Sequence, residues 1–252
     1  ASQTKKRKLS WKLVWKQRYL MLMSLPFPFA LSFFERKFVG FDNFIKAFND
    51  RIFGQTLRNT LALSALGIVF QTLASVSLAV ILNEIRLPRL KKITQTVSYL
   101  PHFVSWVIIA SIAKMMLNDG GIVDELFGRR LGLMSTNSPV FWGTVTFINI
   151  WKEVGWDAII YLSAMAGLDP GLYEAAQIDG AGRFQRIWHS TLPGIRPTII
   201  VIVIMSIGGV LNVGMERQML LSNALVQDHA MVFSWFAYVR GIGNNNYGLG
   251  TA

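Results

Sequence analysis

Three charged side chains lie in the middle of a long apolar stretch of this sequence. Lys152, Glu153 and Asp157 interrupt residues 141–167, which otherwise hold mostly aliphatic, aromatic and small side chains. Glu153 and Asp157 are four residues apart, so they share one face if the segment is a helix. Carboxylates on one face can accept hydrogen bonds from hydroxyl or amide donors, or they can pair with cations. We therefore look first to this stretch for polar chemistry.

Aromatic and amide side chains surround these charges. Flat rings can stack on the apolar faces of sugar rings while polar neighbours bond the hydroxyl groups. One interpretation is a polar path that contacts a sugar. The alternative is a set of buried ion pairs between helices, with no ligand. The candidate residues for the path are Asn149, Trp151, Lys152, Glu153, Trp156, Asp157 and Tyr161.

Other site chemistries find little support. The chain has no cysteine, which excludes disulfides, thiolate metal sites and cysteine nucleophiles. His102, His189 and His229 lack the spacing of a metal site, so we expect no bound metal. The sequence also lacks a glycine-rich phosphate loop ending in Lys-Ser or Lys-Thr. We expect no catalytic residue and no cofactor bound by this chain.

The elements that position these residues are predicted to be membrane helices. Hydrophobic residues make up 52% of the chain, charged residues only 15%, and the mean hydropathy is +0.39, too apolar for an ordinary soluble domain. A helix needs about 20 apolar residues to cross a bilayer. Four runs come near or exceed this length, and a fifth is shorter and contains two prolines. The predicted crossings are residues 19–34, 61–82, 97–116, 141–167 and 197–213.

The basic residues predict the orientation. With a cytoplasmic N-terminus, Lys and Arg are roughly twice as dense in the cytoplasmic segments (1–18, 83–96 and 168–196) as in the outer ones, which agrees with the positive-inside rule. These cations do not form one patch between aromatic platforms, so no nucleic acid partner is expected. Residues 19–252 then form one transmembrane domain, and the polar, glycine-rich end suggests a sixth crossing beyond the given sequence.

The first 18 residues combine a cluster of Lys and Arg with alternating Trp and Lys. Such a segment can lie at the inner surface of the membrane, held by anionic lipids. A disordered tail is the alternative.

The cytoplasmic segment 168–196 carries the clearest local pattern. Asp169 and Pro170 fit the cap and the first turn of a helix. Glycines within residues 180–182 allow a turn, since glycine tolerates positive φ. A second short helix is predicted to stop at Pro193. The segment is thus either a compact two-helix knob that docks on a partner, or a solvated hairpin between two membrane helices.

The same segment resembles the EAA loop of ABC importer permeases. That pattern is Glu-Ala-Ala, three residues, Gly, nine residues, Ile, any residue, Leu-Pro, and Ser190 stands where Ile is usual. In that family the loop docks into a cleft of the ATPase subunit, and closure of the ATPase dimer moves the membrane helices. The resemblance implies this coupling role for the matching residues, Glu174, Ala175, Ala176, Gly180, Leu192 and Pro193.

Two further segments narrow the resemblance to the maltose-permease-like carbohydrate-uptake superfamily, polysaccharide subgroup. They are Val-Gly-Phe-Asp-Asn-Phe at residues 39–44 and Tyr-Leu-Pro-His-Phe-Val-Ser-Trp at residues 99–106. The more specific expectation is a permease for alginate oligosaccharides. The implied fold is all-α, a polytopic transmembrane helix bundle of the type I ABC importer permease class.

The resemblance also implies partners and a location. An ABC ATPase dimer would bind ATP and Mg²⁺, a second homologous permease would complete the path, and a periplasmic or extracellular solute-binding protein would deliver an oligosaccharide. The chain itself would be a non-enzymatic, multi-pass subunit in the lipids of the bacterial inner membrane. An ion-coupled secondary sugar transporter would have no reason for a docking loop. A membrane-embedded glycosyl-transfer enzyme would need more than Glu153 and Asp157.

Overall fold

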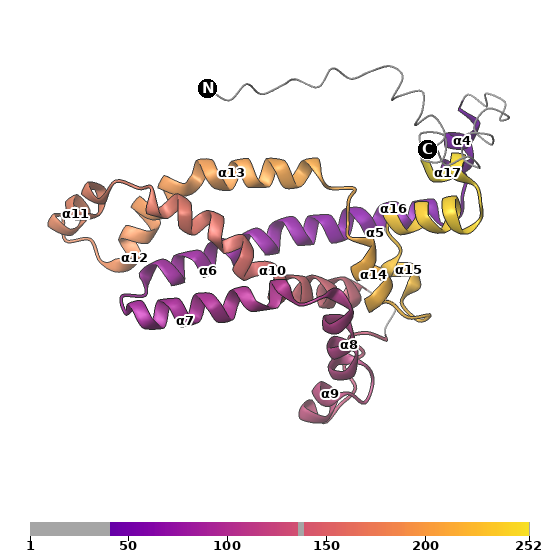
Figure 1. Ribbon diagram of the computed structural model, residues 1–252, viewed down its shortest axis with the longest axis horizontal. Helices are drawn as coiled ribbons and strands as arrows, with labels where there is room; N and C mark the ends of the chain where they lie inside the picture. The colour runs from indigo at the N-terminus through magenta and orange to yellow at the C-terminus, as the bar shows by residue number, and fades with distance from the viewer. Residues whose placement is uncertain (1–40, 136–138, 252) are drawn as a thin grey trace, which may run out of the picture. The chain divides into compact units, whose positions relative to one another are not determined.

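The computed structural model describes residues 41–135 and 139–251, and every regular element in these ranges is a helix (Figure 1). The chain from Phe44 onward forms one compact unit, in which the helices below are placed. The basic segment 1–18 and the predicted crossing 19–34 lie outside the described residues. A short helix, α4 (Asp42–Phe48), precedes the first long one.

The first long helix combines three segments. These are α5 (Phe53–Leu66), the wider π-helical turn η1 (Gly67–Gln71) and α6 (Thr72–Glu84), which together run for 32 residues. The predicted crossing 61–82 is confirmed as helix. It begins earlier than predicted because the first turns contain polar side chains that an apolar window leaves out.

The predicted crossing 97–116 is wrong as a single helix. The chain forms α7 (Pro88–Tyr99) and the 3₁₀ turn η2 (Leu100–Phe103), and a new helix, α8 (Trp106–Leu117), then starts. Figure 1 shows α7 running beside α10, whereas α8 turns away. A further short helix, α9 (Ile122–Phe127), follows α8.

Local chemistry explains this break. Val104 and Ser105 have extended backbones, with ψ of 135° and 150°, and the Ser105 hydroxyl accepts a hydrogen bond from the amide of Ile108 at 3.5 Å. A serine in this conformation is a favoured helix cap. Pro101 adds to the break because it lacks the N–H that a continuing helix would use. A prediction from apolar composition alone includes neither the Ser105 cap nor the missing N–H of Pro101.

The central helix is α10 (Pro139–Ala166), which confirms a helix over the predicted crossing 141–167 but is not among the candidate membrane spans of the described residues. Its 28 residues give a length of about 42 Å at 1.5 Å per residue. The helix packs against α5, η1 and α6 on one side, and it also contacts α7, η2 and α13. It therefore carries its charged residues into the middle of the bundle.

The two-helix knob follows α10. It comprises α11 (Pro170–Ile178) and α12 (Arg183–Arg186), and the π-helical turn η3 (Ile187–Thr191) then leads into α13 (Leu192–Gly208). Figure 1 places the knob at the end of the bundle where α6 gives way to α7.

The prediction that a helix stops at Pro193 is wrong, because residues 183–208 are continuously helical. The wide turn η3 explains the difference. The amide of Leu192 donates to the carbonyl of Ile187, five residues back. Pro193 then falls in the first turn of α13, where a missing N–H costs little.

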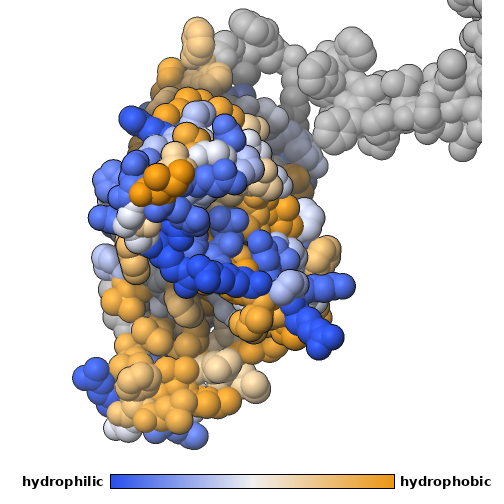
Figure 2. Space-filling model, turned by 90° about the vertical axis from the view of Figure 1, so that its left-hand side faces the viewer, coloured by the Kyte–Doolittle hydropathy of each residue, from blue (hydrophilic) through white to orange (hydrophobic). Residues whose placement is uncertain are grey.

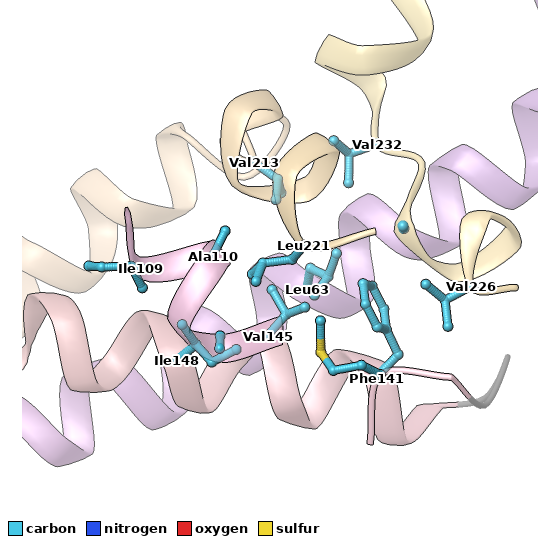
Figure 3. Packing of buried hydrophobic residues seen from close by; sticks show 13 residues of the cluster. Leu63, Ile109, Ala110, Phe141, Val145, Ile148, Val213, Leu221, Val226 and Val232 are labelled. Carbon is cyan, nitrogen blue, oxygen red and sulfur yellow. The ribbon is translucent and has the colours of Figure 1, made fainter. Parts of the chain in front are cut away.

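The chain continues through short helices at the opposite end. These are α14 (Met215–Leu221), α15 (Gln227–Ala230), α16 (Phe233–Ala237), the π-helical turn η4 (Tyr238–Gly243) and α17 (Tyr247–Thr251). A hydrophobic core fixes α14, α15 and α16 to α5, α8 and α10 (Figure 3). In this core Leu63 of α5 and Phe141 and Val145 of α10 pack with Leu221 and Val226.

Three helical stretches of the described residues are long and apolar enough to cross a membrane, namely residues 53–84, 106–127 and 183–208. Many of their large apolar side chains are exposed, including Ile81, Ile112 and Met205. Exposed apolar side chains on helices of this length are expected where lipid, rather than water, is the solvent.

Candidate functional site

A polar hollow of about 270 Å³ lies between the long helix α5–α6 and the helices α10, α13 and α14. Three of the predicted path residues line it: Asn149, Asp157 and Tyr161. Tyr161 is only 2% exposed and belongs to a small apolar core that joins α6, α10 and α13. One wall of the hollow is thus anchored to this core.

A chain of hydrogen bonds crosses one wall of the hollow. Gln71 Nε2 donates to Asp157 Oδ2 at 2.7 Å, and Asn149 Nδ2 donates to Gln71 Oε1 at 3.3 Å. Arg217 Nη1 in turn donates to Asn149 Oδ1. Asn149 and Asp157 are eight residues apart, about two turns, and so lie on the same face of α10. The chain links η1, α10 and α14 through polar groups.

Three other predicted path residues form a second cluster beside η2. Lys152 is 5% exposed, and its Nζ lies 3.0 Å from Glu153 Oε1 and donates to the carbonyl of His102 at 2.6 Å. His102 Nδ1 lies 2.5 Å from Glu153 Oε2. The His102 ring stacks on Trp156 with 4.3 Å between ring centroids. Lys152 and Glu153 are neighbours in α10, and their contacts with His102, together with the stacked ring of Trp156, fasten α10 to η2.

The seventh path residue, Trp151, joins neither group. Its side chain is 52% exposed, and its position on α10 is about 120° around the helix from Asp157, at about 100° per residue. The structure therefore divides the predicted set into a hollow-lining group, an ion-pair cluster and one outward-facing ring.

The knob places the residues of the predicted coupling loop on an exposed surface. Glu174 and Ala175 are exposed and Ala176 is half-buried. Gly180 has a φ of +76°, the left-handed conformation that favours glycine. Leu192 is half-buried and Pro193 exposed where η3 becomes α13.

Local hydrogen bonds define the shape of the knob. Asp169 Oδ1 accepts from the amide of Gly171 at 2.8 Å, which confirms the predicted helix cap. Tyr173 Oη and Thr191 Oγ1 lie 3.1 Å apart and join α11 to η3. The knob is therefore tied back to the helix that leaves it.

Large apolar side chains on the knob are unusually exposed. Ile178 is 86% exposed, Phe184 87% and Trp188 69%. Figure 2 looks onto this end of the bundle, where hydrophilic side chains alternate with hydrophobic ones. Exposed aromatic and aliphatic groups among polar ones are typical of a protein-binding surface.

Three residues that take part in the hydrogen-bond chain or in the Lys152 cluster were not predicted from the sequence as path residues. They are Gln71, Arg217 and His102. Gln71 and Arg217 lie 86 and 68 residues from their partners in α10, and no local pattern marks them. His102 lies within the Leu-Pro-His-Phe segment used for the resemblance, where a proline and a break of helix could have singled it out. No group of three His, Asp or Glu side chains in the described ranges could hold a metal ion.

Long apolar helices around a polar hollow, with an exposed knob at one end, define a membrane transport subunit. Residues 71–227 match the family described as binding-protein-dependent transport system inner membrane component, and the chain belongs to this family. As a member of this family the chain is an ABC transporter permease rather than an enzyme. Membership in this family also excludes the two alternatives, a secondary sugar transporter and a glycosyl-transfer enzyme.

Two relatives come from Bacillus subtilis (strain 168). Protein LplB is 41% identical over 88% of this chain and 71% of its own length. The polygalacturonan/rhamnogalacturonan transport system permease protein YteP is 37% identical over 98% of this chain and 85% of its own.

Two solved structures share the fold. One belongs to a bacterial ABC transporter involved in the import of the acidic polysaccharide alginate, with a TM-score of 0.81 and 33% identity over 96% of this chain and 90% of that one. The other, the bacterial alginate ABC transporter in complex with an alginate pentasaccharide-bound periplasmic protein, gives a TM-score of 0.80 and the same identity over 97% and 90%. The predicted all-α permease fold and the family resemblance are confirmed.

Proposed function

We propose that this chain imports oligosaccharides or polysaccharides as one permease subunit of an ATP-driven, binding-protein-dependent transporter. Similarity over nearly the whole chain to YteP and to the alginate transporters supports a carbohydrate polymer as the cargo. The chain lies in the bacterial inner membrane with its N-terminus in the cytoplasm. Residues 1–18 form a basic surface segment, and residues 19–252 form the transmembrane domain.

The observation that carries the proposed mechanism is the position of the knob in the chain. It directly connects α10 and α13, and both helices line the polar hollow, α10 through Asp157 and α13 through Ser206. A force on the knob is therefore transmitted to two walls of the hollow at once. An ATPase that grips the knob can open and close the path without further linkage.

The residue types on the knob suit such a grip. Ala175 and Ala176 allow a partner to approach closely, and the Glu174 carboxylate can form a charge-assisted hydrogen bond. Gly180 provides the left-handed turn between α11 and α12. Leu192 and Pro193 begin α13 and so connect the knob to the moving helix. Ile178 and Phe184 supply the apolar contact area.

The transported sugar would meet the α10 residues in the hollow. Asn149 and Asp157 present amide and carboxylate groups that bond hydroxyls, and Tyr161 adds a ring to the same wall. Lys152, Glu153 and Trp156 would act next to this wall by holding η2 in place, with Trp151 facing outward.

Three partner proteins complete the proposed machine. An ABC ATPase dimer carries ATP and Mg²⁺, so this chain binds no cofactor. A second homologous permease closes the other side of the path. A periplasmic or extracellular binding protein delivers the sugar at the end formed by α14–α17. The presence of a periplasmic protein in the complex of a solved neighbour supports this kind of partner.

The absence of native cysteine allows a clean test of coupling. Ala175→Cys in the knob and Leu87→Cys in the neighbouring α6–α7 turn would each be modified with a bulky maleimide before assembly with the ATPases. Both positions are exposed, and Figure 1 shows α11 and the turn between α6 and α7 at the same end of the bundle. We expect at least about a tenfold loss of ATP-driven oligosaccharide uptake for modified Ala175→Cys and no loss for modified Leu87→Cys, because only the first blocks the docking surface.

Sidedness provides the second readout of this experiment. A membrane-impermeant maleimide should reach Ala175→Cys only from the cytoplasmic side. Labelling from the exterior, or full coupling by the modified protein, contradicts the proposal.

A further inference from the structure

We infer that Arg217 recognises a carboxylate of the transported sugar, which makes the polar hollow a site for a uronate unit. The inference rests on the proposed function, because it assigns the cargo chemistry of the same hollow. Arg217 belongs to α14, which lies outside the stretch that carries the predicted path residues.

The guanidinium of Arg217 is held in the wall of the hollow. Its Nη1 donates to Asn149 Oδ1, and its Cζ lies 5.8 Å from the centroid of the Trp106 ring. Val213 precedes α14 and Leu221 ends it, and both are buried in the core shown in Figure 3. These apolar anchors fix α14, so the cation is positioned by the fold.

Most of the hydrogen-bonding capacity of Arg217 is unused within the described residues. No carboxylate there lies within 4.0 Å of it, and its Nε is buried without a hydrogen-bond partner. A guanidinium has five N–H donors, and the neutral Asn149 amide engages one group. A partly buried cation without a counter-ion is costly to maintain. A bound anion would remove this cost.

The other cation nearby already has a charged partner. Lys152 lies 3.0 Å from Glu153, whose second oxygen lies 2.5 Å from His102. Asp157 accepts from Gln71 at 2.7 Å. Glu153 acts on Arg217 electrostatically, but from beyond ion-pair distance. The unpaired cation of the hollow is therefore Arg217.

A carboxylate is a better partner for the unpaired guanidinium of Arg217 than the other groups of a sugar. Two oxygens can accept in parallel from the guanidinium, the bidentate geometry for which arginine is suited. A hydroxyl offers no charge. A phosphate dianion would call for a second cation, and Lys152 is occupied by Glu153.

Hydroxyl-binding groups lie on the same walls. Ser75 Oγ is buried, lines the hollow and has no hydrogen-bond partner in the described part of the chain. Asp157 also lines the hollow and can accept from a hydroxyl. One cation with nearby hydroxyl partners matches a sugar acid, with its carboxylate toward Arg217 and its ring hydroxyls toward Asp157 and Ser75.

The test measures binding to the assembled permease pair with its ATPases, without the binding protein, so that only the transporter selects. Two probes are used: digalacturonate and the neutral disaccharide made by reducing its two carboxyl groups. We expect the unmodified transporter to bind digalacturonate about tenfold more tightly or better, as for a charge-assisted bidentate contact. Arg217→Gln should lose this preference while its affinity for the reduced disaccharide stays within about twofold.

Two further variants complete the test. Arg217→Lys should keep part of the preference, since it keeps the charge but not the planar fork. Arg129→Gln removes the same charge from an exposed position outside the hollow and should change neither affinity.

Each remaining outcome is decisive. If the unmodified transporter binds both probes equally, the inference is overturned and the sugar site of the proposed function stands. If Arg217→Gln weakens both probes equally, Arg217 has a structural role and the inference is again overturned. If neither probe binds, both the inference and the assignment of the hollow as the sugar site are contradicted.

Discussion

Gly155 of α10 lies directly against the backbone carbonyl of Ser98 in α7. A Cβ atom on Gly155 would lie 2.0 Å from Ser98 O, far closer than side-chain atoms approach a carbonyl. The two helices therefore touch through their backbones at this point. Glu153 and Asp157 flank Gly155 on α10, so this contact sets how closely α7 can approach the polar residues.

Replacing this glycine should separate the two helices. We expect Gly155→Ala to lower the stability of the folded chain by about 1–3 kcal/mol, the usual cost of overpacking, because the obstacle is backbone that cannot rotate away. Thermal unfolding in detergent measures the change. Gly143→Ala is the matched control in the same helix, since nothing lies within 4 Å of its added methyl group. Equal melting temperatures for the two variants would contradict this account of the helix contact.

The long helices were predicted well because their apolar composition distinguishes them from the rest of the sequence. The stretch 141–167 becomes α10 within two residues of its predicted ends, and Lys152 within it is buried. The regions of Pro193 and Pro101 show where composition stops being informative. Pro193 enters a helix because the wide turn η3 precedes it, while the region of Pro101 breaks because Ser105 can cap a new helix. Both outcomes depend on hydrogen bonds that no composition window contains.

The polar groups show a different limit. The face shared by Asn149 and Asp157 follows from helical spacing alone. Their partners do not, since Gln71 and Arg217 come from elements brought close only by packing. Sequence patterns reveal residues that are close along the chain. Gln71 and Arg217 are close to their partners in α10 only in the folded structure.

The turn at Gly180 provides a test of the coupling role. Gly180→Pro cannot adopt the φ of +76°, because the proline ring holds φ at about −65°. The change also removes the amide that donates to the carbonyl of Gln177 at 3.0 Å. We expect ATP-driven uptake to be abolished with normal insertion into the membrane, because the distortion is confined to the knob. Uptake into proteoliposomes and the yield of inserted protein are the measurements.

Gly182→Ala is the control for this turn. Gly182 has a φ of −67°, and an added Cβ would meet only the side-chain oxygen of Gln185 at 3.8 Å. This variant should couple normally. Normal uptake by Gly180→Pro would count heavily against the coupling role of the knob.

The hydrogen bond between Gln71 and Asp157 should couple the long helix α5–α6 to α10. A double-mutant cycle with Gln71→Ala and Asp157→Ala isolates this interaction, and we expect a coupling free energy of about 1–3 kcal/mol. Unfolding free energies in detergent provide the four values. In a parallel cycle Gln71→Ala is combined with Ser163→Ala, whose hydroxyl bonds the carbonyl of Ile159 one turn back in α10. This control cycle should be additive, and additivity in both cycles would rule out the proposed link.

We expect the contribution of Lys152 and Glu153 to stability to depend on both charges being present together. Lys152→Met removes the cation paired with Glu153 and leaves the carboxylate with its contact to the His102 ring, while the methionine preserves the buried stem. Removing one partner of a buried pair costs up to about 3–5 kcal/mol, and the 23% exposure of the Glu153 side chain places the expected loss below that range. Adding Glu153→Gln removes the orphaned charge and should recover most of the lost stability, because a neutral amide can still bond His102. The measurement compares the melting temperature of Lys152→Met with that of the double variant. A double variant that is less stable than Lys152→Met would mean that the Glu153 charge stabilises this part of the bundle by itself.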